Sequence, residues 1–332
     1  MYTSVMKGVG HYVPERVVTN AELEEQLNTS DTWIRERTGI QERHFFTPGK
    51  DTVASMSAAA ARMALDRAGL QAQDIDFIVL ATITPDYYFP GSGVLLQREL
   101  GLPGIGALDI RVQCTGFIYA LSIADQYIKT GMYKHVLVIG AEIQSSAMDM
   151  TPRGRGVSVI FGDGAGAAVV SASEEQGRGV LSTHLHADGT YAEELVIKDP
   201  GSSRPQRMYE AMGELDGTYC YMNGNAIFKH AIQRFSEAVQ EALATNHVTK
   251  DEIDLLVPHQ ANYRITRYLQ EQLELRDEQV FSNIHKYGNT TAASIPIALS
   301  EAWAEGRIQS GDLVCLAAFG SGFTWGSALI RW

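Results

Sequence analysis

The order of helix and strand patterns in the first half of the chain returns in the second half. Residues 53–68 form an alanine-rich amphipathic pattern that predicts a helix, and the apolar residues 74–81 after it predict a buried strand. The same pair recurs at 228–244 and 251–257, with the same Ile-Asp pair at the start of the strand. An internal duplication of an α/β unit is the simplest account, although such helix–strand pairs are common in any α/β protein.

A glycine-rich motif also occurs twice, as FGDGAG at residues 161–166 and as FGSG at residues 319–322. We expect each copy to follow an apolar strand and to lead into another. The polar stretch 171–177 suits a connection between the repeated parts. We therefore divide the chain into an N-terminal half, residues 1–172, and a C-terminal half, residues 173–332.

The composition argues against several classes of protein. Of the 332 residues, 45% are apolar and 20% are charged, which is ordinary for a folded globular chain, and a net charge of -12 argues against a nucleic-acid partner. No run of about 18 apolar residues occurs and the N-terminus lacks a secretion signal, so we expect a cytoplasmic protein without membrane spans. The three cysteines form no CxxC pair, which argues against both a disulfide framework and a zinc site, and we expect no metal.

Cys114 lies where an apolar strand pattern, residues 105–112, gives way to a helical pattern that begins near Phe117. A thiol at a helix N-terminus faces free backbone N–H groups, which lower its pKa from about 8.5 and favour the thiolate. A nucleophile is therefore one interpretation of Cys114. A small buried thiol is the other, and this stretch alone leaves both open.

Two further polar residues stand at comparable junctions. His259 follows the strand predicted at 251–257, and the ends of strands are where α/β sheets present catalytic groups. Asn289 lies in a Gly-Asn-Thr turn before a helix of small residues, where asparagine is by default a helix cap. Each residue has a structural explanation by itself, but the combination of the three is far more specific than any member.

This combination resembles the β-ketoacyl-acyl-carrier-protein synthase III family. The resemblance covers nearly the whole chain, and the landmarks fall in the family's order: residues 33–39, CTG at 114–116, FGDGAG at 161–166, HQAN at 259–262, GNT at 288–290 and FGSGFTWG at 319–326. It implies a thiolase-like α/β fold in which duplicated βαβαβ halves form a layered α-β-α-β-α architecture.

The resemblance also implies an acyltransferase that joins an acyl-CoA primer to malonyl-acyl carrier protein by a decarboxylating Claisen condensation, initiating fatty-acid or polyketide-like chains. Cys114 would hold the acyl group as a thioester, and the backbone N–H groups of Cys114 and Ser321 would stabilise the oxyanion. His259 and Asn289 would donate hydrogen bonds to the malonyl thioester carbonyl. No cofactor is expected, since acyl-CoA is a substrate. Cys315, in an apolar strand pattern, is expected to be core and not the second catalytic cysteine of a thiolase.

By the same resemblance, further residues would contact the substrates. Those expected to bind coenzyme A are Trp33, Arg37, Arg155, Gly224, Phe228 and Asn262. Those expected to meet the acidic carrier protein are Lys229, Arg264 and Arg267, which composition alone would assign to a solvated charged surface. Phe89 matches the position that closes the acyl pocket across a dimer in relatives, so a homodimer is expected.

Three features depart from the family's pattern. Gln113 is bulkier and more polar than the alanine usual before the nucleophile, and Ser321 stands where glycine or alanine is common. The long segment 188–222 is the third, and from Asp199 onward it has no counterpart in the first half, so we expect a surface insertion or a pocket lid. The primer, the carrier protein and the pathway therefore stay open. Two alternatives remain: an acyltransferase of a specialised pathway that works without decarboxylation, and a non-catalytic partner subunit.

Overall fold

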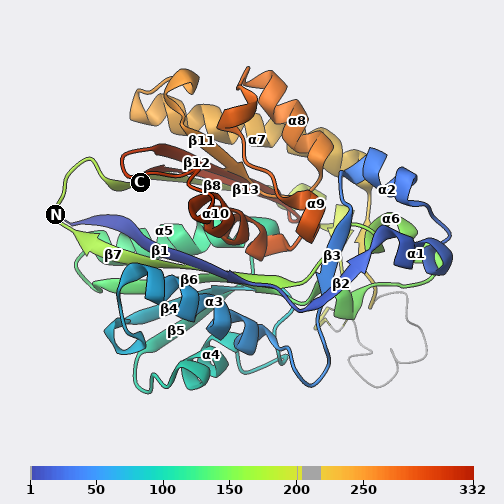
Figure 1. Cartoon of the computed structure of the whole chain (residues 1–332), viewed down its shortest axis with the longest axis horizontal. Coiled ribbons are helices and arrows are strands. Elements are labelled where there is room, and N and C mark those ends of the chain that lie inside the picture. The colour runs from blue at the N-terminus through green and yellow to red at the C-terminus, as the bar shows by residue number, and fades with distance from the viewer. Residues whose placement is uncertain (1, 200, 204–217) are drawn as a thin grey trace.

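A computed structural model describes residues 2–199, 201–203 and 218–332. Five layers follow one another in Figure 1: helices, a sheet, central helices, a second sheet and further helices. This is the α-β-α-β-α order that the family resemblance implies. Both chain termini lie at the same end of the layers (Figure 1).

The larger sheet has five strands in the order β1-β7-β6-β4-β5. Its β4 pairs in parallel with β5 and β6, whereas β7 pairs antiparallel with β6 and β1. The bounds are β1 Thr3–Tyr12, β4 Phe77–Ala81, β5 Gly106–Ile110, β6 His135–Glu142 and β7 Gly164–Ser173. Helices α3, Val53–Ala68, and α4, Ser92–Leu100, cover its outer face (Figure 1).

The second sheet has four strands in the order β11-β12-β13-β8. The bounds are β8 Gly179–Ala187, β11 Leu255–Pro258, β12 Leu313–Gly320 and β13 Thr324–Arg331. Helices α7, Gly224–Asn246, and α8, Tyr263–Gln272, cover its outer face, and α5, Gly116–Lys129, and α10, Ser294–Ala304, lie between the sheets (Figure 1). The two sheets take their strands from 3–173 and 179–331, which is compatible with the proposed halves; the boundary at residue 172 stays a prediction.

The shorter elements gather at the end of the layers away from the termini (Figure 1). They are β2 Arg16–Thr19, α1 Asn20–Leu27, α2 Asp31–Thr38, β3 Glu42–Phe45, α6 Arg155–Ser158 and α9 Ile284–Tyr287. A two-stranded ribbon of β9, Leu195–Val196, and β10, Tyr221–Met222, belongs to the segment expected to be an insertion, whose residues 200 and 204–217 lie outside the described part.

The predicted repeat extends to individual hydrogen bonds. Asp76, before β4, donates its backbone N–H to the His135 carbonyl and accepts from the His135 N–H with its carboxylate. Asp254, before β11, makes the same two bonds to Leu313. Each aspartate thus joins the start of one strand to the start of its parallel neighbour, β6 in one half and β12 in the other. The Ile-Asp pair in the sequence marks this structural equivalence.

Local signals account for the helix bounds. Helix α3 occupies the predicted residues, because Thr52 caps its first turn by accepting from the Ser55 N–H at 3.0 Å and Gly69 ends it in the left-handed conformation. Helix α7 begins at Gly224, four residues before the predicted start, after the Asn223 cap. Amphipathic periodicity missed that first turn because it is rich in small and polar residues.

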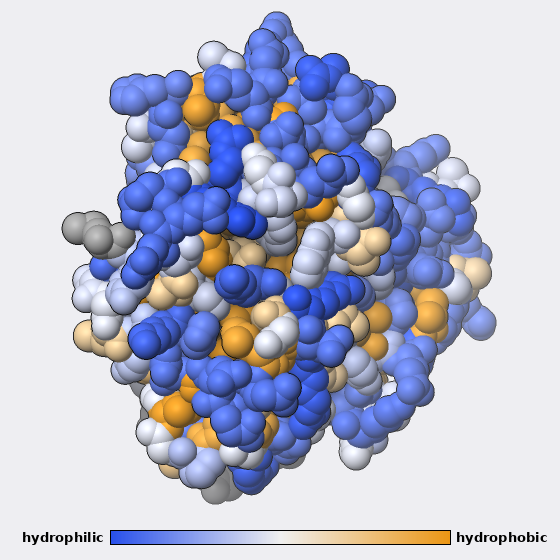
Figure 2. Space-filling view, turned by 60° about the vertical axis from the view of Figure 1, so that its left-hand side comes forward, coloured by the Kyte–Doolittle hydropathy of each residue, from blue (hydrophilic) through white to orange (hydrophobic). Residues whose placement is uncertain are grey.

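The two copies of the glycine-rich motif differ in their surroundings. FGSG at 319–322 ends β12 and turns into β13, as predicted. FGDGAG at 161–166 leads into β7, but helix α6 and a short loop precede it, so the prediction of a strand before this copy was wrong. Hydrophilic residues dominate the face in Figure 2, with hydrophobic residues in patches between them. The described residues contain no helix long and apolar enough to cross a membrane.

Candidate active site

Cys114 lies in a single 3-10 turn, Gln113–Thr115, between the end of β5 and the start of α5. The end of β12 packs directly against it, because a Cβ atom added to Gly320 would lie 3.0 Å from the Cys114 nitrogen. A larger residue at position 320 would require the turn of Cys114 to shift by a few tenths of an ångström. The Thr115 hydroxyl is 2.8 Å from the Thr324 hydroxyl, which joins the turn to β13. Both halves of the chain therefore position the thiol.

A narrow pocket of about 120 Å³ is lined by several residues that were expected to share one site. The three proposed catalytic residues all line it. So do Ser321 and three of the residues expected to bind coenzyme A. The predicted residues in this pocket are Cys114, Gly224, Phe228, His259, Asn262, Asn289 and Ser321.

His259 is buried at the end of β11, where its backbone N–H donates to the Ala317 carbonyl at 2.8 Å. Burial lowers the pKa of His259 to about 3, so its imidazole is neutral at physiological pH. Neither ring nitrogen has a hydrogen-bond partner among the described residues. A buried polar group without a partner is costly. The side chain is therefore suited to donate one hydrogen bond to a bound ligand.

Asn289 is held at both ends of its backbone unit, since its N–H donates to the Ile160 carbonyl at 2.9 Å and its carbonyl accepts from the Gly162 N–H at 3.0 Å. Its Oδ1 accepts from the Thr291 N–H at 2.8 Å, two residues on, so the side chain closes a local turn. This bond fixes the amide and leaves its Nδ2 group as a donor toward the pocket. The default expectation of a helix cap is wrong, because the N-cap residues of the two following helical segments are Thr290 and Ala293.

The expectation that a helix terminus lowers the pKa of Cys114 is wrong for the free protein. The thiol is buried, and desolvation together with the nearby Glu142 carboxyl raises its pKa above the ordinary value. Desolvation is the larger cause, because a thiolate loses its hydration in such a site. The Cys114 thiol is therefore protonated at neutral pH in the free protein.

We expect alkylation of Cys114 by iodoacetamide to accelerate about tenfold per pH unit between about pH 6 and 9, without a plateau. Only the thiolate reacts, and the raised pKa lies above this range. Mass spectrometry of the Cys114 peptide gives the rate, and the denatured protein, whose thiol titrates near its ordinary value, is the control. A plateau at neutral pH in the folded protein would contradict the expectation.

Three residues expected to bind coenzyme A meet on the outside of this pocket. The guanidinium groups of Arg37 and Arg155 lie 4.5 Å and 5.2 Å from the ring centroid of Trp33. Asn262 caps α8 and also donates from Nδ2 to the Arg37 carbonyl at 2.9 Å, so α8 and α2 are fixed relative to each other. The cluster presents a flat aromatic surface and two cations, which suit an adenine ring and phosphates.

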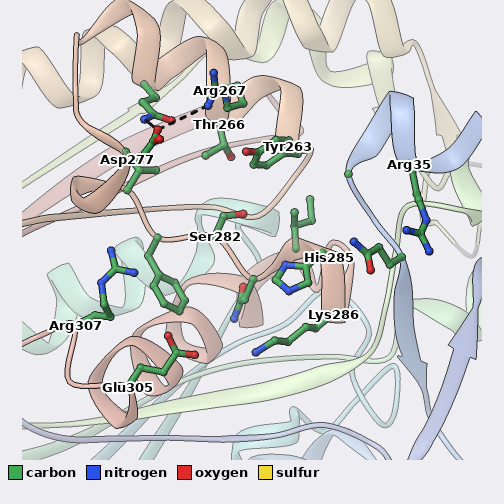
Figure 3. Close-up of a pocket in the computed structure, with 17 residues that line it drawn as sticks. Arg35, Tyr263, Thr266, Arg267, Asp277, Ser282, His285, Lys286, Glu305 and Arg307 are labelled. Atoms are coloured by element: carbon green, nitrogen blue, oxygen red, sulfur yellow. Dashed lines mark hydrogen bonds and ion pairs between the residues drawn. The ribbon is translucent and has the colours of Figure 1, made fainter. Parts of the chain in front are cut away.

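The residues expected to meet a carrier protein do not form one group. Arg264 lies 5.6 Å from the Phe228 ring, near the pocket, and the exposed Lys229 follows Phe228 on α7. Arg267 instead lines a separate groove of about 790 Å³, where its Nη1 is 3.8 Å from the Asp277 carboxylate (Figure 3). Arg264 and Lys229 therefore remain the better placed candidates.

Phe89 does not line the pockets described around Cys114 in a single chain. It is 80% exposed, and its neighbours Tyr87 and Tyr88 are each 57% exposed. Three adjacent exposed aromatic side chains are typical of a contact surface. The role of Phe89 in closing a partner's pocket stays a prediction.

Sequence reasoning missed a group of polar residues beside the thiol. Glu142, at the end of β6, is buried, and desolvation raises its pKa to about 7 although Thr84 donates to its carboxyl. Gln144 and Arg111 line a cavity that includes Cys114. The ends of the predicted strands were the signal available in the sequence. Parallel strands bring their carboxyl ends to one edge of a sheet, so polar residues at those ends are expected to lie near Cys114. Among the described residues, no cluster of three or more His, Cys, Asp or Glu side chains could hold a metal ion.

A layered α/β fold with a cysteine, a histidine and an asparagine around one narrow pocket defines an acyl-transferring enzyme of the thiolase-like class. Family models described as 3-oxoacyl-[acyl-carrier-protein (ACP)] synthase III and as its C-terminal part match residues 108–189 and 243–332. The chain belongs to the β-ketoacyl-acyl-carrier-protein synthase III family. The beta-ketoacyl-[acyl-carrier-protein] synthase III of Salmonella typhi is 47% identical over 331 residues, with 100% of both chains covered.

Solved structures agree with this assignment. The 3-oxoacyl-[acyl-carrier-protein] synthase III of Aquifex aeolicus superposes with a TM-score of 0.91 at 43% identity, over 99% of this chain and 100% of that one. The Thermus thermophilus synthase III gives a TM-score of 0.91 at 40% identity, over 99% of each chain. A priming β-ketosynthase from the R1128 polyketide pathway gives 0.90 at 32% identity, over 99% of this chain and 96% of that one. The thiolase-like fold expected from the sequence is confirmed.

Proposed function

We propose that this enzyme condenses an acyl-CoA primer with malonyl-acyl carrier protein to give 3-ketoacyl-acyl carrier protein, CoA and CO2, and so initiates fatty-acid synthesis. The names of relatives that match the whole chain support this reaction. The observation that carries the proposal is the placement of Cys114, His259 and Asn289 around one narrow pocket that opens beside Phe228 and Gly224.

In the first half-reaction, the Cys114 sulfur attacks the thioester carbonyl of acyl-CoA. A bond forms between Sγ and the acyl carbon, the bond from that carbon to the CoA sulfur breaks, and the thiol proton leaves with CoA. The backbone N–H groups of Cys114 and Ser321 are our candidates for stabilising the oxyanion, since the close approach of Gly320 brings the two segments together. The acyl group is then stored as a thioester, which divides a difficult transfer into two easier steps.

In the second half-reaction, malonyl-acyl carrier protein takes the place that CoA has left. The Nδ2 group of Asn289 and the ring N–H of His259 donate to the malonyl thioester carbonyl, so that the enolate left by loss of CO2 is stabilised. A neutral imidazole suits this task, and burial keeps His259 neutral. The carbanion then attacks the acyl carbon and releases the Cys114 thiolate, which takes up a proton.

The partners and the setting follow from the same proposal. Trp33, Arg37 and Arg155 hold the adenine end of CoA, while Arg264 and Lys229 meet the acidic carrier protein. We propose a cytoplasmic homodimer in which Phe89 reaches the partner's pocket; the exposed aromatic side chains around Phe89 and the position of β5 at the edge of its sheet support an assembly. The chemistry needs no cofactor, because acyl-CoA enters as a substrate.

Two measurements on the purified protein test this function. Intact mass after mixing with a panel of acyl-CoAs reports acyl-Cys114, and release of labelled CO2 from malonyl-acyl carrier protein reports condensation. We expect both for at least one primer. Acyl transfer to an alcohol or amine without a malonyl donor would instead support the acyltransferase alternative. No adduct from any acyl-CoA or acyl carrier protein would support the non-catalytic subunit.

A further inference from the structure

A second cavity, of about 310 Å³, shares Cys114 with the narrow pocket. It lies on the side of the thiol away from α7, between the end of β6 and the segment that holds β9. Its apolar wall includes Ile83, Phe161, Leu195 and Val196. An acyl group bound to the Cys114 sulfur can enter this space, so under the proposed function its lining selects the primer.

Gln144 is a buried polar residue of this lining. This side chain is buried in the turn after β6, and its Nε2 donates to the Thr291 hydroxyl at 2.8 Å. The bond fixes the amide at the cavity wall. No other described residue bonds to it, so the amide oxygen and the second N–H remain for a ligand. A purely hydrocarbon wall would not need a buried amide here.

Two more polar side chains line the same cavity from the turn before the nucleophile. Gln113 has a φ of 46°, in the left-handed region that non-glycine residues seldom adopt. Strained backbone of this kind persists where the surroundings impose it, and such positions cluster at functional sites. Arg111 lines the cavity at its exposed side and forms no ion pair with a described residue.

The charges around the cavity have one sign. None of the described residues that line it is acidic. The Glu142 carboxyl lies close to Cys114, but it already accepts hydrogen bonds from the Thr82 and Thr84 hydroxyls and from the Ile83 N–H. The cavity thus offers amide and guanidinium donors without a competing carboxylate. A plain alkyl chain would bury the free amide group of Gln144 unpaired, whereas a chain that carries an acceptor oxygen would pair with it.

We propose that the preferred primer is a short acyl thioester with an oxygen substituent on its chain, a hydroxy-, keto- or carboxy-acyl group, which Gln144 recognises with Gln113 and Arg111. This inference rests on the proposed function and adds the chemical class of its primer. A site built to hydrogen-bond a substrate rejects the analogue that lacks the bonding group far more strongly than an apolar pocket rejects one extra methylene.

The test compares 3-hydroxybutyryl-CoA with butyryl-CoA, which differ by one oxygen atom. For the unmodified enzyme we expect kcat/KM for condensation to be about tenfold or more higher with the hydroxy compound. In Gln144→Leu, which keeps the side-chain size and removes the amide, the preference should fall to about unity or reverse. Gln240→Leu, on the exposed face of α7, is the matched control and should retain the preference. Succinyl-CoA with Arg111→Gln tests a carboxylate in the same way.

The possible results distinguish failure of the proposed primer class from failure of the proposed condensation. If butyryl-CoA acylates Cys114 and condenses as well as or better than both oxygenated primers in the unmodified enzyme, the primer class is overturned and the condensation stands. Equal loss of preference in Gln144→Leu and Gln240→Leu would also overturn it, because Gln144 would then have no special part. If no primer gives an adduct or CO2, the proposed function itself fails.

Discussion

Replacement of Cys114 by alanine should lower the rate of condensation by about four orders of magnitude or more. Among the described residues, Cys114 is the one cysteine that lines the pocket with His259 and Asn289, whereas Cys220 lines the second cavity without reaching that pocket. The Cys114→Ala protein should show no mass gain with any acyl-CoA. Alanine is smaller than cysteine and makes no new contact with Gly320, so the fold should persist. Intact mass and labelled CO2 release measure the two effects.

The cysteines elsewhere in the chain provide the control for this prediction. Cys315 lies in β12, is fully buried and does not line either cavity at Cys114. Cys315→Ala should therefore keep its acyl adduct and most of its activity, with only a modest loss of stability from the small void. An adduct that survives in Cys114→Ala, or disappears in Cys315→Ala, would contradict the assignment of the nucleophile.

The sequence predicted the repeated helix–strand unit well because two independent signals agreed, whereas the layered architecture came from the family resemblance. Apolar periodicity placed α3 and β4, and the repeated Ile-Asp pair placed the corresponding strand β11. The hydrogen bonds of Asp76 and Asp254 explain why that pair recurs, since each carboxylate joins two parallel strands at their starts. Such a signal is local and therefore readable from one sequence.

The electrostatics of the site could not be predicted in the same way. The helix terminus near Cys114 suggested a lowered pKa, but burial against Gly320 and the closeness of Glu142 depend on strands far apart in the chain, and desolvation raises the pKa instead. The position of Gln144 in the cavity wall could not be predicted for the same reason, because it depends on strand pairing. The parallel pairing of β4 with β5 and β6 brings residue 144 to the nucleophile.

The orientation of the surface arginine side chains could also not be predicted from the sequence. Arg264 and Arg267 are three residues apart on α8, a spacing that places both on the same face of the helix. Packing of α8 against the rest of the fold directs Arg264 to the Phe228 ring and Arg267 to Asp277 in the separate groove (Figure 3). Sequence spacing alone does not distinguish the two.

Asn289→Asp should abolish decarboxylation while leaving the acylation of Cys114 within a few fold of the unmodified enzyme. Aspartate has the shape of asparagine, and one carboxylate oxygen can still accept from the Thr291 N–H, so the turn and the fold are retained. The change removes the Nδ2 donor and places a negative charge where the enolate oxygen would develop. Loss of one such donor costs about 2.7 to 4 kcal/mol, a factor of about 100 to 1000 in rate, and the added charge increases the loss.

Separate assays of the two half-reactions show whether Asn289 acts where we propose. Labelled CO2 release from malonyl-acyl carrier protein should fall in both Asn289→Asp and Asn289→Ala, and further in the former, because alanine lacks the donor without adding a charge. Mass gain at Cys114 should persist in both variants. Equal CO2 release by the two variants and the unmodified enzyme would contradict the proposed role of Asn289 in decarboxylation, and its side chain would then serve only to bond Thr291. Stabilisation of the enolate would in that case depend on His259, whose ring nitrogens have no other partner among the described residues.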